Sequence, residues 1–151
     1  MIFLDTGFIH AFVSREDANH HRVREVVQAH RGRRLFDFVL TTNYVVGEAI
    51  TLIRTRDKAQ LGRRHQLAVE TGRQLFAGVF GRIHRVTAEE EQDAFAYFER
   101  YRDKVYSFVD CLSFVVMEKY GIQEAWAVDD DFSHRFTAIP GPASDSRSRK
   151  G

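Results

Sequence analysis

Two acidic residues follow apolar runs at points where the chain is expected to leave a sheet. Asp5 comes directly after the apolar run 2–4, and Asp129 comes directly after the run 124–128. Ligands of open parallel sheets bind beyond the carboxyl ends of the strands. We therefore expect these two carboxylates at the same edge of one sheet.

Two further acids are expected to point toward that edge from helices. Asp110 lies in the first turn of an apolar helix, on the face of Phe114 and Met117, so its carboxylate should point inward. Glu48 borders the apolar stripe of another helix and could reach across a cleft. Taken singly, Asp5, Asp110 and Asp129 are also explained as capping or turn residues, and Glu48 as a solvated helix residue.

Taken together, four converging carboxylates indicate a divalent metal ion. Two carboxylates about 4 Å apart repel by roughly 1 kcal/mol in water and about 4 kcal/mol at an effective dielectric constant of 20, so a cluster persists only around a cation. Hard oxygen ligands select Mg²⁺ or Mn²⁺. Such an ion polarises a phosphodiester and lowers the pKa of bound water, which suits hydrolysis of a nucleic-acid backbone.

The elements that must position these acids alternate between strands and helices. The helix that holds Glu48 opens at Thr42 or Asn43, and residues 58–80 are predicted to be helical, with breaks at three glycines. The alternation predicts one α/β domain over residues 1–140, with a mostly parallel sheet of about five strands flanked by helices. Residues 141–151 offer no large apolar side chain and are expected to be a disordered tail. The predicted strands are 2–4, 35–40, 83–86, 124–128 and 136–139.

Composition and charge exclude several classes of protein. A chain of 151 residues that is 44% hydrophobic can bury one core but hardly two. Its net charge of +1 argues against a polybasic coat protein, so any contact with a polyanion must come from local patches. The single cysteine, Cys111, allows no intrachain disulfide and favours an intracellular protein. With no signal peptide and no apolar run near the roughly 20 residues of a membrane span, we expect a cytoplasmic location and no membrane contact.

One segment is locally basic and could lead RNA toward the acidic cleft. Residues 51–85 carry eight arginines and lysines against two acids. The plainer interpretation is an ordinary solvated helical face, and Arg31, Arg33 and Arg34 would extend the basic surface. The candidate RNA-binding residues are Arg54, Arg56, Lys58, Arg63 and Arg64.

Four stretches in order along the chain resemble the PIN-domain ribonucleases, and among them the VapC-type toxins. They cover nearly the whole chain outside the tail, from Ile2 to about Pro140. The resemblance implies a PIN-like three-layer sandwich, endoribonuclease activity that depends on Mg²⁺ or Mn²⁺, a homodimer, and an antitoxin partner that blocks the active site. The four stretches are Phe3-Leu4-Asp5-Thr6, Tyr44 to Glu48, Tyr106 to Cys111 and Val128 to Phe132.

The resemblance also implies a role for individual residues. Asp5, Glu48, Asp110 and Asp129 match the acidic quartet of the family, with Asp5 and Asp110 as the most direct metal ligands and Asp131 as a weaker candidate. Thr6 and Ser107 match positions that usually carry a hydroxyl, and we assign both to orienting neighbouring carboxylates, with helix capping as the alternative. We expect a homodimer to use the aromatic-rich segment from Phe95 to Tyr106.

Three other functions fit parts of the sequence. A PIN-like module that binds RNA or a protein without cutting would keep the same acids. A phosphoryl-accepting receiver domain is also a small α/β fold with an acidic Mg²⁺ pocket, but it needs paired acids after the first strand, where Asp5 stands alone. Asp5-Thr6-Gly7 spells the aspartic-protease signature, yet that chemistry belongs to an all-β scaffold.

Overall fold

A five-stranded parallel sheet forms the centre of the computed structural model, which describes residues 1–144. The strand order is β3-β2-β1-β4-β5, and every neighbouring pair runs parallel. The sheet predicted to be mostly parallel is therefore parallel throughout. The strands are β1 (Ile2–Leu4), β2 (Val39–Thr42), β3 (Arg82–His84), β4 (Glu124–Ala127) and β5 (Thr137–Pro140).

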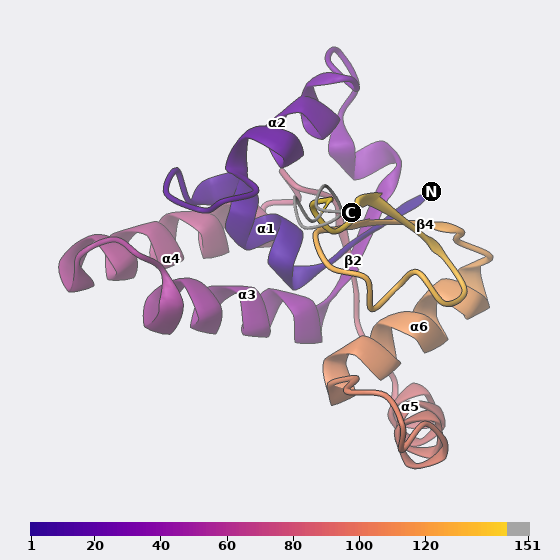
Figure 1. The fold of residues 1–151 in the computed structure, drawn as a ribbon. Helices are drawn as coiled ribbons and strands as arrows, with labels where there is room; N and C mark the ends of the chain where they lie inside the picture. The colour runs from indigo at the N-terminus through magenta and orange to yellow at the C-terminus, as the bar shows by residue number, and fades with distance from the viewer. Residues whose placement is uncertain (145–151) are drawn as a thin grey trace, which may run out of the picture.

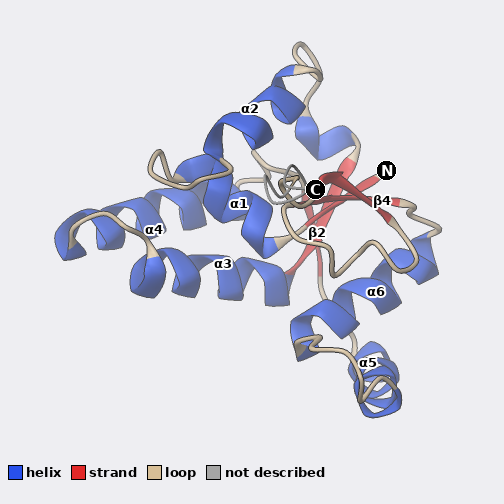
Figure 2. Ribbon diagram, in the orientation of Figure 1, coloured by secondary structure: helices blue, strands red, loops and turns tan. Residues whose placement is uncertain are grey.

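Helices cover both faces of this sheet (Figures 1 and 2). The first four pack against one another on one side, and the last two pair on the other, which makes the predicted three-layer sandwich. A 3₁₀ turn, Leu35–Asp37, precedes β2. The helices are α1 (Thr6–Val13), α2 (His20–Gln28), α3 (Asn43–Arg56), α4 (Leu61–Phe76), α5 (Ala88–Arg100) and α6 (Phe108–Tyr120).

The order of the strands creates a switch point between β1 and β4. From β1 the chain moves outward through β2 to β3, then crosses the sheet to place β4 on the other side of β1. Such a reversal leaves a crevice at the carboxyl ends of the two central strands, where ligands of doubly wound sheets bind. Asp5 follows β1 at this crevice and Asp129 lies two residues beyond β4, so the two acids lie at the same edge, as predicted.

Buried aromatic side chains hold the layers together. The Phe8 ring of α1 stacks on Trp126 of β4 at 5.1 Å, and Phe114 of α6 meets Phe132 edge to face at the same distance. Helix α6 is buried on most of its circumference because it lies between the sheet and α5. Cys111, as predicted, is fully buried there as a free thiol.

Two sequence predictions about local structure were wrong. The strand predicted for 35–40 begins only at Val39, because pairing with β1 starts at Ile2 and Val39 and the preceding residues turn instead. Helix α4 also runs unbroken through Gly62 and Gly72. A Cβ at Gly72 would lie 3.1 Å from a methyl group of Ile50, so this glycine lets α3 and α4 approach closely rather than interrupting the helix. Gly78, with φ of +76°, follows the helix end.

The predicted tail lies largely outside the described residues, which end at 144. Just before that point, Arg22 of α2 donates hydrogen bonds to the carbonyl oxygens of Pro140 and Gly141, at 3.1 and 3.0 Å. These bonds fix the chain where it leaves β5. Over residues 1–144, no helix is both long and apolar enough to span a membrane.

The fold disagrees with two of the alternative functions. A receiver domain has the strand order 2-1-3-4-5, whereas β1 is central here with β4 beside it. An aspartic protease needs an all-β scaffold, and this chain is mostly helical.

A buried glutamate outside the acidic quartet joins three elements. Glu90 of α5 accepts hydrogen bonds from Lys119 Nζ of α6 at 2.6 Å and from His84 Nε2 of β3 at 2.8 Å. It also accepts the Thr87 backbone N–H at 3.0 Å, which completes a capping box. Burial alone would raise the pKa of Glu90, but these donors lower it to about 2.

Glu90→Gln is expected to lower the free energy of unfolding at pH 7 by on the order of 3 kcal/mol, at about 1.4 kcal/mol per pKa unit. Because the folded pKa of Glu90 lies below the unfolded value, its contribution is present above about pH 4.5 and is lost as the pH falls toward 2. Urea unfolding between pH 2 and 7 measures both effects. The exposed neighbour Glu89 supplies the control, and an equal loss in Glu89→Gln would contradict the assignment.

Candidate metal centre

Asp5 is the most deeply buried of the predicted acids. Its side chain is 5% exposed, and its backbone N–H donates to the Trp126 carbonyl at 3.1 Å, which ties it between β1 and β4. It occupies the N-cap position of α1, yet its carboxylate makes no capping hydrogen bond. The backbone therefore uses Asp5 as a helix start, while the side chain stays free for another role.

Asp110 has both of the roles considered for it. Its carboxylate accepts the backbone N–H of Ser107 at 2.9 Å, while Ser107 Oγ accepts the backbone N–H of Asp110 at 3.0 Å. This capping box confirms the plainer interpretation of both residues. It also fixes the direction of the carboxylate, because one oxygen is held at the helix start.

Asp129 and Asp131 share a turn after β4. An oxygen of the Asp129 carboxylate accepts the backbone N–H of Asp131 at 3.2 Å, so Asp129 is a turn former as well as a candidate ligand. Burial, followed by the charges of Asp129 and Asp110, raises the pKa of Asp131 to about 6. Both acids therefore lie within electrostatic range of the cluster.

Glu48 approaches from the second turn of α3. Thr42 fixes the start of this helix, since its hydroxyl accepts the Val45 backbone N–H at 3.1 Å. Glu48 is half-buried, and its charge contributes to raising the pKa of both Asp5 and Asp110. The position on the edge of the apolar stripe is as predicted.

Burial and mutual repulsion both act on the carboxylates of this site. Burial, then the charges of Asp110 and Asp129, hold the pKa of Asp5 well above its usual range. Burial likewise raises the pKa of Asp110, with Asp129 and Glu48 adding to the effect. Among residues 1–144, no ion pair involves any of these acids. The charges of the predicted acids therefore act on one another, and no ion pair in the described residues neutralises them.

The residues present fit a hard divalent cation by their chemistry. All the candidate donors are carboxylate oxygens, the ligands that Mg²⁺ and Mn²⁺ prefer. The hydroxyl of Thr6, 4% exposed and next to Asp5, has no hydrogen-bond partner, which is unusual for a buried polar atom. Within the described chain, however, no group of three or more His, Cys, Asp or Glu side chains is arranged to hold an ion as it stands. The metal site and the orienting roles of Thr6 and Ser107 thus stay predictions.

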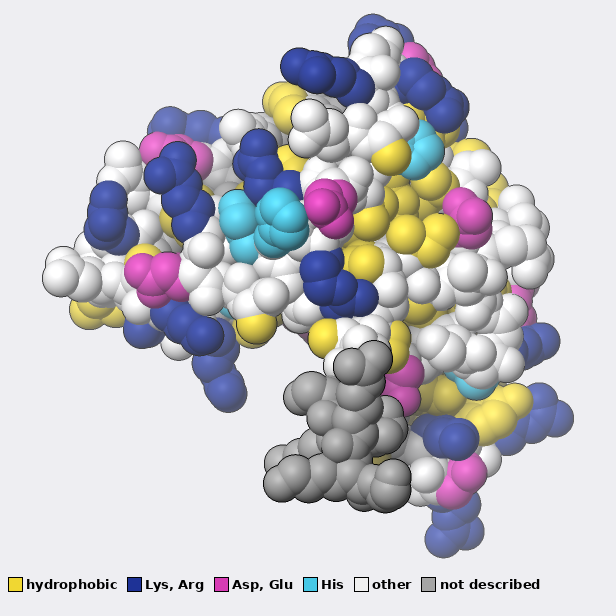
Figure 3. All heavy atoms as spheres, turned by 45° about the horizontal axis from the view of Figure 1, so that its top comes forward, with side chains coloured by type: hydrophobic (Ala, Val, Ile, Leu, Met, Phe, Trp, Pro, Cys, Tyr) yellow, Lys and Arg dark blue, Asp and Glu magenta, His cyan; other side chains and the backbone are white. Residues whose placement is uncertain are grey.

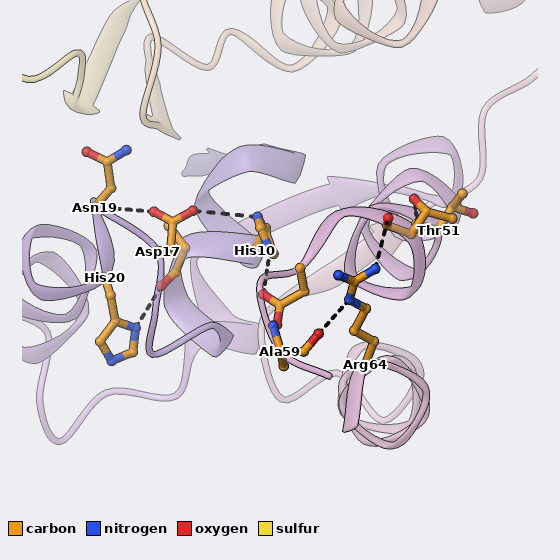
Figure 4. A network of polar contacts seen from close by, with 10 residues as sticks. His10, Asp17, Asn19, His20, Thr51, Ala59 and Arg64 are labelled. Carbon is orange, nitrogen blue, oxygen red and sulfur yellow. Dashed lines mark hydrogen bonds and ion pairs between the residues drawn. The ribbon is translucent and has the colours of Figure 1, made fainter. Parts of the chain in front are cut away.

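The candidate RNA-binding residues gather at one end of the molecule. They surround the turn between α3 and α4, a helical hairpin that projects from the sheet (Figure 1) and carries many Lys and Arg side chains at the left of Figure 3. Arg54, Arg56 and Lys58 are exposed, as is Arg63. Arg64 differs, because it donates to the Ala59 carbonyl at 2.7 Å and to that of Thr55 at 3.4 Å (Figure 4).

A second network closes this turn against α1. His10 Nε2 lies 2.9 Å from the buried Asp57 carboxylate, and its other ring nitrogen lies 3.6 Å from Asp17 (Figure 4). Asp57 also accepts the Ala59 backbone N–H at 3.0 Å. The turn of the hairpin is thus held by side chains that are not candidates for RNA binding.

Sequence reasoning missed two residues beside the acids. A Cβ at Gly7 would lie 3.0 Å from Val128 and 3.8 Å from the Asp5 carboxylate, so glycine keeps the space beside Asp5 open. His134 donates from Nδ1 to the Asp131 carbonyl at 2.9 Å and accepts the Tyr97 hydroxyl at 2.8 Å, which fastens the Asp129–Asp131 turn to α5. Asp5-Thr6-Gly7 hinted at Gly7, but nothing in the sequence pointed to His134.

Comparison with known proteins agrees with this geometry. The model of the PIN domain family matches residues 2–135. The chain is 37% identical over 133 residues to the 23S rRNA-specific endonuclease VapC20 of Mycobacterium tuberculosis, in two strains, a match that covers 88% of this chain and 92% of the relative. The crystal structure of Mycobacterium tuberculosis VapC20, described as a sarcin-ricin loop cleaving toxin, superposes with a TM-score of 0.76 at 34% identity. That superposition covers 89% of this chain and 94% of the other.

When no divalent metal is present, Asp5→Asn is expected to raise the free energy of unfolding by ~1–3 kcal/mol, because it removes a buried, repelled charge. Each kcal/mol corresponds to a rise of about 3 °C in Tm. The folded pKa of Asp5 lies above the unfolded value, so wild-type stability should fall as the pH rises from about 4. Adding Mn²⁺ should raise the Tm of the wild type more than that of the variant.

Thermal unfolding with chelator and with Mn²⁺ measures these shifts. Asp130→Asn is the matched control, since Asp130 is an exposed acid in the same run of aspartates. A lower Tm for Asp5→Asn than for this control in chelator would overturn the account of repulsion.

Proposed function

The chain belongs to the PIN-domain family, and from this premise we propose that it is a VapC-type endoribonuclease whose carboxylate cluster cuts RNA with Mg²⁺ or Mn²⁺. The observation that carries the proposal is the buried Asp5 at the switch point between β1 and β4, whose pKa is raised by burial and by the charges of Asp110, Asp129 and Glu48. An ion bound there would polarise the scissile phosphodiester and lower the pKa of the attacking water.

The four acids differ in how firmly the protein holds them. Asp5 is fixed by burial and Asp110 by its capping box, so we assign these two as the principal ligands. Asp129 and Glu48 would complete the site from a turn and from a half-buried helix position. We favour Asp129 over Asp131 because its charge raises the pKa of both Asp5 and Asp110.

We propose a structured RNA, ribosomal RNA in particular, as the substrate. The support is the relative named for 23S rRNA, whose length the chain matches almost completely. The exposed cations Arg54, Arg56, Lys58 and Arg63 would hold phosphates beside the cleft. Arg64 takes a structural role in this proposal, since it binds the carbonyls that end α3.

An antitoxin partner, a homodimer and a cytoplasmic location complete the proposal. An antitoxin is implied by membership of the VapC type. The segment predicted for dimerisation exposes the stacked rings of Phe95 and Phe98, 54% and 46% accessible, and the side chain of Val105. Exposed apolar side chains of this kind suit a protein interface.

Purified protein should cut a ribosomal RNA fragment that contains the sarcin-ricin loop, in Mg²⁺ or Mn²⁺ but not in chelator. Asp5→Asn and Asp110→Asn should each lower kcat at least ~100-fold, because each removes ligand charge at nearly constant shape. Asp129→Asn should cost more than Asp131→Asn if Asp129 faces the metal. Gel analysis of cleavage products, with Asp130→Asn as the matched control, measures these effects. RNA binding without cleavage under every condition would favour the non-cutting module instead.

The basic hairpin generates a separate expectation. Arg54→Gln with Arg56→Gln should raise KM for RNA several-fold and leave kcat unchanged, because exposed arginines contact phosphate and not the reacting atoms. Arg64→Gln should instead lower the Tm by a few degrees, since it loses hydrogen bonds to Ala59 and Thr55. Steady-state kinetics and thermal unfolding of the variants separate the roles. A fall in kcat for the double variant would refute this division.

A further inference from the structure

Three arginines converge at the edge of the sheet opposite the acidic cleft. Arg33 and Arg34 precede β2, and Arg82 opens β3, so all lie at the amino ends of parallel strands. A hydrogen bond from Arg34, together with the charges of Arg34, Arg82 and Arg33, lowers the pKa of Asp37. Arg33 and Arg34 line one cavity together with Phe36, and Arg82 lies over the ring of that phenylalanine. The candidate cations of the α3–α4 turn lie at the other end of α4, which is about 24 Å long.

This arginine cluster carries excess positive charge. Arg34 pairs with Asp37 through two hydrogen bonds, at 2.9 and 3.2 Å. Arg33 and Arg82 have no acidic partner in residues 1–144, and the single polar contact of Arg82 is with the Met1 sulfur at 3.7 Å. Three cations against one acid leave a local charge of +2. Figure 3 shows Lys and Arg side chains along the upper rim, over the segment between α2 and β2.

Two phenylalanines organise the unpaired arginines. The guanidinium carbon of Arg33 lies 4.1 Å from the ring centroid of Phe38, and that of Arg82 lies 6.0 Å from the ring centroid of Phe36. A guanidinium that rests on a ring keeps its N–H edges free for an anion. Phe36 is itself 46% exposed, so one aromatic ring beside the cations remains accessible.

A shallow cavity adjoins these side chains. It has a volume of about 510 Å³ and is bounded by Arg33, Arg34, Phe36 and the turn 77–79. A Cβ at Gly78 would lie 2.8 Å from the Phe36 ring, so glycine allows the ring to rest against this turn. The cavity thus places guanidinium groups beside an exposed aromatic ring.

We propose that this arginine–phenylalanine surface, Arg33, Arg34, Phe36 and Arg82, is a second RNA-binding site. Guanidinium groups match phosphate oxygens in geometry as well as charge. An exposed ring beside them offers a stacking surface for an unpaired base. An acidic protein would satisfy the charges but would not need the ring. The proposal rests on the proposed function in one respect only, namely that RNA is the polyanion.

The position of the surface determines what it could contribute. It lies about one strand length, ~13 Å for four residues, from the edge that holds the carboxylates. A short oligonucleotide in the cleft would not reach it, whereas a folded RNA could contact both edges. The second site should therefore strengthen binding of long structured RNA and leave the cleavage chemistry unchanged.

Binding is measured with Asp110→Asn protein, so that cleavage does not interfere. Arg33→Gln with Arg82→Gln should weaken binding of a ribosomal RNA hairpin about tenfold and make the slope of log Kd against log salt shallower by ~2. Phe36→Leu should weaken binding with little change in that slope. Arg15→Gln with Arg24→Gln is the matched control, because it removes two exposed cations elsewhere. A short single-stranded oligonucleotide should bind all variants alike.

Any of the following three outcomes would overturn the proposal. Equal weakening in the control would mean a general effect of charge, and unchanged hairpin binding would remove the site. Displacement of the hairpin by an acidic peptide, with no effect of Phe36→Leu, would assign the surface to a protein instead. Circular dichroism checks that the variants fold.

Cleavage assays in the protein with Asp110 intact separate this proposal from the proposed function. The double arginine variant should raise KM for the hairpin at unchanged kcat. If the wild type cuts no RNA and the arginines still govern binding, the second site stands and the nuclease proposal fails. If cleavage is normal and the arginines affect neither KM nor binding, the second site alone fails.

Discussion

The burial of Asp5 close to other carboxylates is the constraint on which the candidate site depends. Asp5 cannot be moved into water, because it directly follows the central strand β1, is hydrogen-bonded through its backbone to Trp126 of β4 and is almost fully buried. Asp110 is directed toward it by a capping box that the helix needs in any case. The pKa values of both groups are raised because the folded protein disfavours their charged forms, and ionising them therefore lowers its stability. A cation in this crevice would relieve that cost, so affinity for metal and local instability have the same origin.

Apolar packing and buried polar groups with hydrogen-bond partners stabilise the rest of the fold. Glu90 is as deeply buried as Asp5, yet its pKa is lowered because Lys119, His84 and a backbone N–H all donate to it. The contrast between these two acids shows what distinguishes a structural carboxylate from a candidate ligand. Glu90 has a full set of hydrogen-bond donors, whereas Asp5 is influenced by other carboxylates.

Basic surfaces are kept apart from the acids and from each other. The α3–α4 hairpin carries its cations on a projection, and the arginine–phenylalanine surface lies at the amino ends of the strands. Such a separation avoids direct pairing between arginines and the carboxylates, which would neutralise the site. It also spreads positive potential over a length of surface suited to a folded RNA, although the net charge of the chain is close to zero.

The sequence by itself determined the identity of the acids, the alternation of strands and helices, and the edge at which Asp5 and Asp129 lie, because these depend on local patterns of apolar and turn residues. It misjudged residues 35–38 and the helix at Gly72, where contacts with β1 and with Ile50 override local preference, and it also wrongly predicted a break at Gly62. Only the tertiary structure decided which of the arginines meet. Arg82 stands beside the start of β2 because β3 pairs with it in a register that joins Leu40 to Arg82. It likewise decided that His134 holds the Asp131 turn against α5. Contacts of this kind join residues far apart in the chain, and their geometry depends on packing between layers, which no local spacing encodes.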